Sequence, residues 1–375
     1  MLRVAFVDQR GSEAGGAERS LALLLDHLPL DVLPTVVLFE DGRYAQSLRA
    51  RGYRVEIVPI PPALAQSTRE RPTLRAAVRL PAAAFHLARL FQCWGVDVVH
   101  TNTVKAHLVA ASAARIAGLP CVVHLRDILE GSSRTALRMI AAGCSQERIA
   151  ISRAVARAYA LPDTVVIENP LDVNSYGALP DRTEARRDLG IGGDEPVVAI
   201  VGRINRWKGH DRFLRAAARV CARASVQFAI VGAPVFRDAD FLEELRALAD
   251  ALGLRSRVHF IGWLDDPRAA YAAIDVLCNC SKREPFGRTI IEAAAAGIPS
   301  VCFDDGGAAE AVIHGVTGLV VPAEDEAALA AAILTYVFDP DQRAAAGAAA
   351  RAATLRFDAR RHADKVVGVL RRAAA

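Results

Sequence analysis

Two glutamates with seven residues between them lie in the segment KREPFGRTIIEAAAAGIP, residues 282–299. At about 100° per residue, an unbroken helix would place Glu284 and Glu292 roughly 80° apart, so they would not share one face. Pro285 is unfavourable inside a helix and favourable just before one. We therefore expect Glu284 on a loop and Glu292 inside the helix that follows. Two such carboxylates could bind two hydroxyl-bearing parts of an elongated ligand, such as a sugar next to a ribose.

The residues between the two glutamates form the expected start of that helix. Backbone N–H groups at a helix start have no partner inside the helix, and they stabilise ligands that carry oxygens or negative charge. We therefore expect ligand contacts from the stretch that contains Phe286, Gly287, Arg288 and Thr289.

A second candidate loop lies in VVAIVGRINRWKGHDRF, residues 197–213. An apolar strand is expected to end at Gly202, and Arg203 and Lys208 follow before a helix begins after Gly209. Two cationic side chains at the carboxyl end of a strand, beside a helix start, are suited to bind a pyrophosphate. They can also neutralise the charge that a divalent metal neutralises in other phosphate sites.

Two adjacent glycines follow the first expected strand, in FVDQRGSEAGGAERS. Gly15 and Gly16 would let a ligand approach the backbone at a helix start. A plain glycine-containing turn is the alternative interpretation. The G-x-G-x-x-G spacing that marks a dinucleotide-binding oxidoreductase is absent, which argues against that class.

Histidines end two neighbouring expected strands, His100 in VDVVHTN and His124 in PCVVHLRDI. An imidazole at the mouth of a sheet could hydrogen-bond a sugar hydroxyl. A core histidine with a satisfied hydrogen bond is the other possibility. Trp263 follows another strand and could hold a flat base, although a strand-end role in the core is an equally good explanation.

Composition excludes several classes of function. The chain of 375 residues carries a net charge of only +4, which argues against a dedicated nucleic-acid-binding protein. The seven cysteines lack the spacing of a zinc site or a disulfide framework. The aspartate pairs at 265–266 and 304–305 are more simply explained as helix caps or turns than as metal ligands.

The expected location is the cytoplasm, because no apolar stretch approaches the ~20 residues that a membrane span needs. A peripheral contact with the inner face of a membrane stays open. The locally basic stretch STRERPTLRAAVRLPAAAFHLARL, residues 67–90, could lie on anionic lipid, or it could be a solvated helix face. Its arginines are Arg69, Arg71, Arg75, Arg79 and Arg89.

Short β-branched runs alternate with longer alanine- and leucine-rich segments, which predicts parallel sheets covered on both faces. The expected strands cover residues 2–8, 34–40, 54–60, 96–102, 121–127, 148–152 and 164–169, and then 197–203, 226–232, 257–263, 275–281, 299–305 and 317–322. The stretch 170–196 is rich in proline, glycine and charge and is interpreted as a linker. We therefore predict an α/β protein with two doubly wound domains, at 1–170 and 171–355, and a C-terminal helix at 356–375 that packs back on the first domain.

These motifs together resemble the group 1 retaining glycosyltransferases, which use nucleotide sugars and have two Rossmann-like domains facing a cleft in the GT-B arrangement. The resemblance covers nearly the whole chain, and EPFGRTIIE and GRINRWKG are its most specific motifs. The pairs GGAE and NP, the latter after VVIE, are weaker alone. The chain departs from many members at Asn169-Pro170, where they have Asn-Gly, and at SKRE before the glutamate pair.

The resemblance implies roles for single residues. Glu284 and His124 would face the transferred sugar, and Glu292 would bind the ribose. Arg203 and Lys208 would hold the diphosphate leaving group, and Gly16 would lie close to the phosphate or the acceptor. The remaining candidates for donor binding are Gly15, Gly202, Trp263, Phe286, Gly287, Arg288 and Thr289.

The resemblance also implies the reaction, the transfer of a sugar from a UDP- or GDP-sugar to a saccharide or lipid-linked acceptor in bacterial surface-polysaccharide or glycolipid synthesis. A leaving phosphate oxygen could take the acceptor's proton, which permits attack on the front face with retention and without a metal or an enzyme base. A double displacement would need a carboxylate beneath the anomeric carbon. Glu284 is the obvious candidate, and we expect it to be too far away.

Two alternatives stay open. A sugar-nucleotide epimerase of similar architecture would use the same phosphate and ribose contacts, with further acid and base carboxylates in the first domain. A catalytically inactive relative would bind a nucleotide sugar or a partner protein, although intact Arg203, Lys208, Glu284 and Glu292 argue against it.

Overall fold

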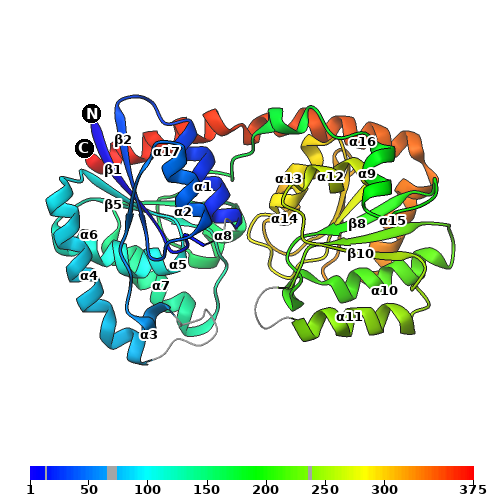
Figure 1. Ribbon diagram of the computed structural model, residues 1–375, viewed down its shortest axis with the longest axis horizontal. Helices are drawn as coiled ribbons and strands as arrows, with labels where there is room; N and C mark the ends of the chain where they lie inside the picture. The colour runs from blue at the N-terminus through cyan, green and yellow to red at the C-terminus, as the bar shows by residue number, and fades with distance from the viewer. Residues whose placement is uncertain (13–14, 66–73, 235–238) are drawn as a thin grey trace. The chain divides into compact units, whose positions relative to one another are not determined.

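The computed structural model describes residues 1–12, 15–65, 74–234 and 239–375, and the chain divides into two compact units (Figure 1). Unit 1 comprises Met1–Pro170 and Ala359–Ala375, and unit 2 comprises Leu171–Asp358. Each unit is built on one parallel β-sheet. None of the described helices combines the length and the apolar character that crossing a membrane requires.

The sheet of unit 1 has seven strands in the order β3-β2-β1-β4-β5-β6-β7, and all of its strand pairs are parallel. Helices cover both of its faces, so its central strands are apolar runs rather than alternating patterns. The strands are β1 (Leu2–Asp8), β2 (Val32–Leu38), β3 (Arg54–Ile57), β4 (Val98–Thr101), β5 (Cys121–Leu125), β6 (Glu147–Ala150) and β7 (Thr164–Val166).

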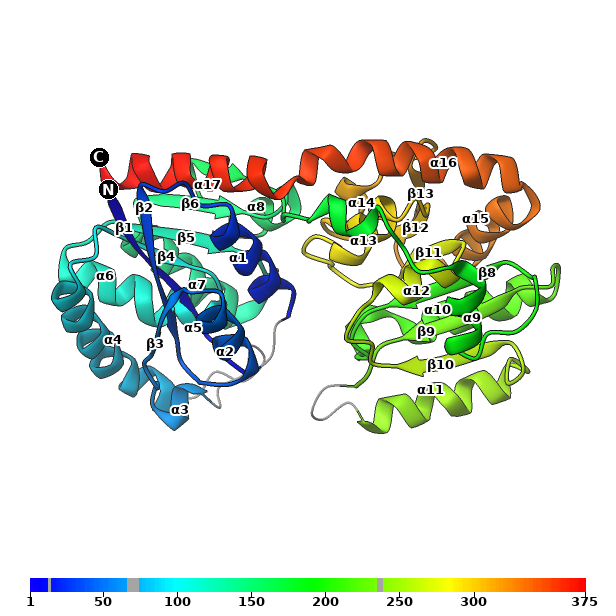
Figure 2. The ribbon, with the colours of Figure 1, turned by 45° about the horizontal axis from the view of Figure 1, so that its top comes forward.

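One face of this sheet packs against α1, α2 and α17, while α4, α6 and α7 lie on the other face (Figures 1 and 2). The helices of unit 1 are α1 (Gly16–Asp26), α2 (Arg43–Ala50), α3 (Pro62–Ala65), α4 (Leu74–Trp94), α5 (Val104–Ala106), η1 (His107–Ala111), α6 (Ser112–Ala117), α7 (Gly131–Cys144), α8 (Arg153–Tyr159) and α17 (Ala359–Ala374).

Helix α17 comes from the far end of the chain and completes the core of unit 1. It packs against α1, which lies oblique to it in Figure 2, and it contacts β4, β5 and β6. Its buried side chains recur at helical spacing, at Ala363, Val366, Val367 and Leu370. They pack in one cluster with Leu21 and the other leucines of α1. The amphipathic pattern of residues 359–374 therefore covers a sheet built mostly from the first half of the chain.

The sheet of unit 2 has six parallel strands in the order β10-β9-β8-β11-β12-β13. All thirteen predicted strands therefore have counterparts among the described residues. The strands of unit 2 are β8 (Val197–Val201), β9 (Gln227–Val231), β10 (Val258–Gly262), β11 (Val276–Asn279), β12 (Ser300–Phe303) and β13 (Gly318–Val321).

Helices α10, α11 and α15 share one apolar cluster with this sheet, and α9 packs against α12. The helices of unit 2 are η2 (Val173–Tyr176), α9 (Arg182–Asp188), η3 (Arg206–Lys208), α10 (His210–Cys221), α11 (Ala239–Ala251), α12 (Arg268–Ala273), α13 (Arg288–Ala295), α14 (Ala308–Ala311), α15 (Glu326–Phe338), α16 (Pro340–Ala353) and η4 (Thr354–Phe357).

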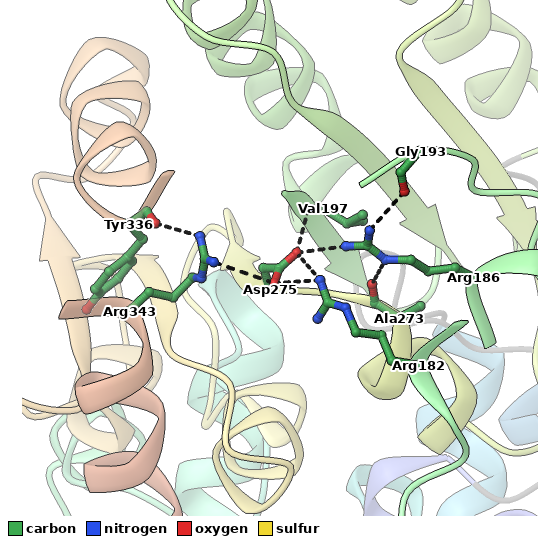
Figure 3. A network of polar contacts seen from close by, with 8 residues as sticks. All are labelled: Arg182, Arg186, Gly193, Val197, Ala273, Asp275, Tyr336 and Arg343. Carbon is green, nitrogen blue, oxygen red and sulfur yellow. Dashed lines mark hydrogen bonds and ion pairs between the residues drawn. The ribbon is translucent and has the colours of Figure 1, made fainter. Parts of the chain in front are cut away.

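The stretch interpreted as a linker is in part a packed helix, which corrects that interpretation. Helix α9 lies within it, and two of its arginines bind the buried carboxylate of Asp275 (Figure 3). Arg186 Nη2 lies 2.9 Å from Asp275 Oδ2, and Arg182 Nη2 lies 2.8 Å from Oδ1. The charges that suggested a solvated connector serve instead to fix α9 to the sheet.

In both sheets the strand order reverses next to the first strand of the unit, between β1 and β4 and between β8 and β11. Ligands of open parallel sheets bind outside the carboxyl ends of the strands at such points. We therefore expect a ligand-binding site at the loops after β1, β4, β8 and β11.

Candidate functional site

Lys208 and Glu284 meet at the carboxyl ends of β8 and β11. Lys208 Nζ lies 2.6 Å from Glu284 Oε2, and the side chains are only 18% and 8% exposed. A short turn places the lysine, because the side chain of Asn205 accepts a hydrogen bond from the backbone N–H of Lys208 at 3.2 Å. The two residues that the sequence assigned to a diphosphate and a sugar are thus in direct contact.

Gly209 lets the lysine turn pass close to the loop after β11. Its φ is +73°, in the region that favours glycine, and a Cβ atom would collide with the backbone carbonyl of Cys280. Because no other residue fits there without displacing that carbonyl, Gly209 fixes the distance between the lysine turn and the loop that carries Glu284.

The backbone of Glu284 is tied to the loop after β12. Its N–H donates to the Asp305 carbonyl at 3.1 Å, and its carbonyl accepts from the Gly307 N–H at 2.6 Å. Both backbone groups of Glu284 are thus held by the loop after β12. Glu284 itself lies on a loop before α13, as the proline before that helix predicts.

Burial opposes ionisation of Glu284, but the surrounding donors outweigh it. The charge of Lys208, together with hydrogen bonds from Lys208, from Ser281 and from the backbone of Gly287, holds the pKa of Glu284 below its usual range. Glu284 is therefore a carboxylate at neutral pH, and it forms a buried ion pair with the lysine.

Glu292 lies inside α13 and is 4% exposed. Its Oε2 accepts a hydrogen bond from the Tyr271 hydroxyl at 2.9 Å, and its Oε1 accepts from Arg288 Nε at 2.8 Å. Both contacts went unrecognised in the sequence. The spacing of four residues between Arg288 and Glu292 was an available signal, because residues four apart on a helix are neighbours. No comparable signal links Tyr271 to Glu292.

The start of α13 lacks a side-chain cap, although Gly287 is buried. Gly287 occupies the position before the helix with φ +86°, and no side chain caps the first turn. Phe286 is buried, and its ring packs edge-on against Phe357 with centroids 5.8 Å apart. Thr289 is half-buried. Because the N–H of Gly287 already donates to the Glu284 carboxylate, the backbone after Gly287 is the part of this segment that can offer N–H groups to a ligand.

The other candidates in unit 2 are more exposed. Arg203 directly follows Gly202 after β8 and is exposed. Trp263 follows β10, is 54% exposed, and donates from Nε1 to Asp265 at 3.1 Å. Both residues lie beyond the carboxyl ends of their strands, where the sequence placed them.

In unit 1, the start of α1 is occupied by the chain's own carboxylate. Gly15 precedes the helix and Gly16 is its first residue, and hydrogen bonds from the backbone N–H groups of Gly15 and Glu18 reach the carboxylate of Glu18. Such a contact from the third helical residue satisfies donors at the helix start. The N–H of Gly15, which the sequence made a candidate for donor binding, therefore already has an internal acceptor.

His124 is the last residue but one of β5 and is completely buried, as is His100. The rings contact one another, with His100 Nε2 at 3.2 Å from His124 Nδ1, and Arg126 Nη2 lies 3.3 Å from the same atom. Burial, reinforced by the charge of Arg126, lowers the pKa of His124 well below its usual range, so the ring is neutral. Its Nε2 has no hydrogen-bond partner among the described residues.

A buried polar network surrounds Arg126, and it was not predicted from the sequence. Arg126 Nε donates to Asn102 at 2.6 Å, and Arg126 Nη1 donates to Asn169 at 2.5 Å. Asn102 in turn donates to Asp8 Oδ2 at 2.5 Å. Each residue lies at or just beyond the end of a different strand, and such long-range pairing leaves no local pattern in a sequence.

Within the described part of the chain, no group of three or more histidine, cysteine, aspartate or glutamate side chains is arranged to hold a metal ion. The neighbours of Glu284 and Glu292 are instead cationic side chains and hydroxyl groups. What these residues can do chemically is bind anionic oxygens and accept hydrogen bonds from hydroxyls.

Two family models match the chain. The model for glycosyl transferases group 1 matches residues 181–353, and the model for glycosyltransferase family 4 matches residues 14–175. A D-inositol 3-phosphate glycosyltransferase of Kribbella flavida is 32% identical over 275 residues, which are 68% of this chain and 61% of that protein. One of Rhodococcus opacus is 34% identical over 289 residues, 72% and 59% of the two chains. The matched region spans about three-fifths of these curated relatives.

Solved structures are similar over the full length. The Anabaena protein HepE, in complex with UDP and glucose, has a TM-score of 0.85 and 30% identity, with 99% of each chain covered. A sucrose-phosphate synthase from Thermosynechococcus elongatus has a TM-score of 0.81 at 20% identity, with 99% of each chain covered, and it shows the fold alone. Together with the two parallel sheets, these similarities confirm the predicted GT-B fold.

Proposed function

Because this chain belongs to the group 1 glycosyltransferases, we propose that it moves a hexose from a UDP-sugar to a saccharide or lipid-linked acceptor with retention of configuration. The family supports sugar transfer. HepE, which has also been solved with UDP-glucose, supports a uridine nucleotide as the donor. The contact between Lys208 and Glu284 is the observation from which we assign the reaction to particular residues.

Lys208 is the group that best fits the diphosphate of such a donor. Its ammonium is largely shielded from water, and it is held beside the start of α10. As the bond from the sugar C1 to the diphosphate breaks, negative charge grows on the β-phosphate, and a fixed cation in a dry site stabilises that charge more than it stabilises the ground state. Arg203 supplies a second cation after the same strand. With two cations in this role, the proposal requires no metal.

Glu284 fits a binding role better than a nucleophilic one. Its carboxylate is committed to Lys208, Ser281 and the Gly287 backbone. A carboxylate whose lone pairs are taken up in this way is a poor attacking group. We therefore favour attack by the acceptor hydroxyl on the face that the diphosphate leaves. The new C1–O bond forms there, and the proton of the acceptor passes to the departing phosphate oxygen.

The tautomer of His124 decides which of its ring nitrogens could donate a hydrogen bond to the sugar. Arg126 can only donate, so Nδ1 of His124 accepts and Nε2 carries the hydrogen. That N–H has no partner among the described residues and would suit a hydroxyl oxygen of the transferred sugar. The complete burial of the ring is the observation that weighs against this role.

For the acceptor, we favour a lipid-linked saccharide at the inner face of a bacterial membrane, in surface-polysaccharide or glycolipid synthesis, with the enzyme in the cytoplasm. Helix α4 contains no acidic residue, and Val78, Arg79, Phe85 and Arg89 are exposed on it. Cationic and apolar side chains on one helix suit an anionic lipid surface. Of the predicted basic stretch, Arg69, Arg71 and the side chain of Arg75 lie outside the described residues.

The experiment measures transfer of radiolabelled sugar from UDP-glucose and related UDP-sugars to water or to lipid extracts. Lys208→Ala should lower kcat by about 100-fold or more, because it removes a cation at the developing charge. Lys282→Ala is the matched control, since Lys282 pairs with Glu324 at 3.0 Å and is 48% exposed. Equal rates for Lys208→Ala and the wild-type protein would refute the role of Lys208. Inversion at C1 in the product would refute the front-face reaction.

A further inference from the structure

Tyr271 holds one oxygen of the glutamate that we assign to the donor ribose. The residue lies on α12, is 1% exposed, and donates its hydroxyl hydrogen to Glu292 Oε2 at 2.9 Å. A second acceptor, the Thr289 carbonyl, lies at 3.5 Å and is therefore the weaker one. The ring packs edge-on against Tyr176, with centroids 5.9 Å apart, and this contact helps to fix its position.

The hydroxyl of Tyr271 can only act as a donor here. Burial and the charge of Glu292 raise the pKa of Tyr271 well above its usual value. The proton therefore stays on the phenol at neutral pH. Since Glu292 is itself buried, this bond fixes the plane of its carboxylate rather than adding a weak surface contact.

Counting lone pairs shows what the fixed carboxylate can still bind. The two oxygens of a carboxylate accept about four hydrogen bonds, two on each oxygen. Tyr271 occupies one position on Oε2 and Arg288 Nε occupies one on Oε1. This count leaves one position on each oxygen, and two acceptor positions on one carboxylate match two adjacent hydroxyl groups.

We propose that Tyr271 is a positioning residue that makes Glu292 selective for a nucleotide with an intact ribose 2′,3′-diol. The inference rests on the proposed function, because it takes Glu292 to be the ribose contact of the donor. It adds the part of the site that discriminates a ribonucleotide from a deoxyribonucleotide. Without the phenol, Arg288 holds only Oε1, so the carboxylate can turn about that contact and bind one hydroxyl nearly as well as two.

The test compares two ligands on one protein. Calorimetric titration of the full chain with UDP and with 2′-deoxy-UDP gives the ratio of their dissociation constants, in which any inactive fraction cancels. The wild-type protein should bind UDP about 10-fold more tightly, since one hydrogen bond to a charged group is lost with the deoxynucleotide. In Tyr271→Phe the ratio should fall to roughly 2-fold. Tyr336→Phe, at another buried tyrosine of unit 2, should keep the wild-type ratio.

The outcomes separate this inference from the proposed function. A wild-type protein that binds no UDP contradicts the donor proposal itself. If the wild-type protein and Tyr271→Phe prefer UDP over 2′-deoxy-UDP by the same ratio, the role of Tyr271 is overturned. The donor proposal is unaffected by that result. Equal losses of the ratio in Tyr271→Phe and Tyr336→Phe would indicate a general effect on the packing of unit 2, and this would also overturn the inference.

Discussion

Glu18 lies in unit 1 at a place that disfavours its ionised form. It is 4% exposed at the start of α1, and Asp8, itself completely buried, lies close enough to repel it. Burial first and the charge of Asp8 second raise the pKa of Glu18 to about 7. The ordinary glutamate pKa is 4.5, so folding favours the protonated form. The stability gained from Glu18 is complete below pH 4.5 and is lost as the pH rises through 7.

We therefore expect Glu18→Gln to stabilise the protein at pH 8 and to leave it nearly unchanged at pH 4. The amide keeps the shape and can still accept the N–H bonds at the helix start. One pKa unit corresponds to about 1.4 kcal/mol, so the gain at pH 8 is on the order of 3 kcal/mol. Thermal unfolding at the two pH values measures it. Glu184→Gln, at an exposed glutamate in the first turn of α9, should show no such dependence. A Glu18→Gln variant no more stable at pH 8 than the wild type would contradict the assigned cause.

Single residues differ in how far the sequence revealed them. Glu284 and Lys208 stand on loops whose glycines and proline have a local meaning, so their places could be predicted. Arg126 and Tyr271 could not, because each acts through partners on other elements. Arg288 was predicted only as a backbone contact, although its side chain neutralises Glu292. Hydrogen bonds between distant segments depend on the packing of whole elements, and no spacing in the chain records that packing.

At the scale of elements, α9 is fixed by a charge at the amino end of β11. Asp275 accepts hydrogen bonds from Arg182, Arg186 and the Val197 backbone, and its side chain is 8% exposed (Figure 3). Arg343, from α16, approaches within 3.9 Å of the same carboxylate. This network therefore ties α9 and α16 to the ends of β8 and β11 that lie opposite the candidate site.

Asp275→Asn should destabilise unit 2 by about 3 kcal/mol, because it leaves buried arginine charge without its counter-charge. Urea unfolding followed by circular dichroism measures the loss. The control is Asp266→Asn. Asp266 pairs with Arg268 in an exposed contact, with side chains 51% and 41% exposed, and such pairs contribute about 0–1 kcal/mol. If both substitutions cost the same, the network around Asp275 is no more important than a surface pair.

The strands were predictable because burial on both faces leaves continuous apolar runs, as in Val197–Val201. Helix α9 was not, since its proline-, glycine- and charge-rich surroundings have the composition of a connector. Only the partner, 87 residues or more away at Ala273 and Asp275, gives those arginines a structural role.

At the scale of the whole molecule, unit 1 is discontinuous in sequence. Leu370 of α17 is completely buried in the same cluster as Leu21 and Leu24. An amphipathic pattern at residues 359–374 is visible in the sequence. Nothing in that pattern specifies which of two similar sheets the helix covers, because both present apolar faces.

We expect Leu370→Ala to lower the stability of unit 1 by about 2–5 kcal/mol, since it opens a cavity in that cluster. Trp94 lies in unit 1, whereas Trp207 and Trp263 lie in unit 2. In a background with phenylalanine at 207 and 263, the fluorescence of Trp94 reports the unfolding of unit 1 in urea. The neighbouring Arg371→Ala removes only an exposed pair with Asp31 and should have little effect. An unchanged Trp94 transition in Leu370→Ala would show that α17 does not stabilise unit 1.

The place of α17 also bears on how the protein is made. A ribosome releases the first 170 residues long before residue 370, and all of unit 2 is synthesised in the interval. Throughout that time, the leucines of α1 and the adjoining strands lack their cover, so the nascent first half exposes an apolar surface that can bind chaperones or aggregate. Synthesis of unit 2 therefore sets the minimum delay before unit 1 can reach its native state.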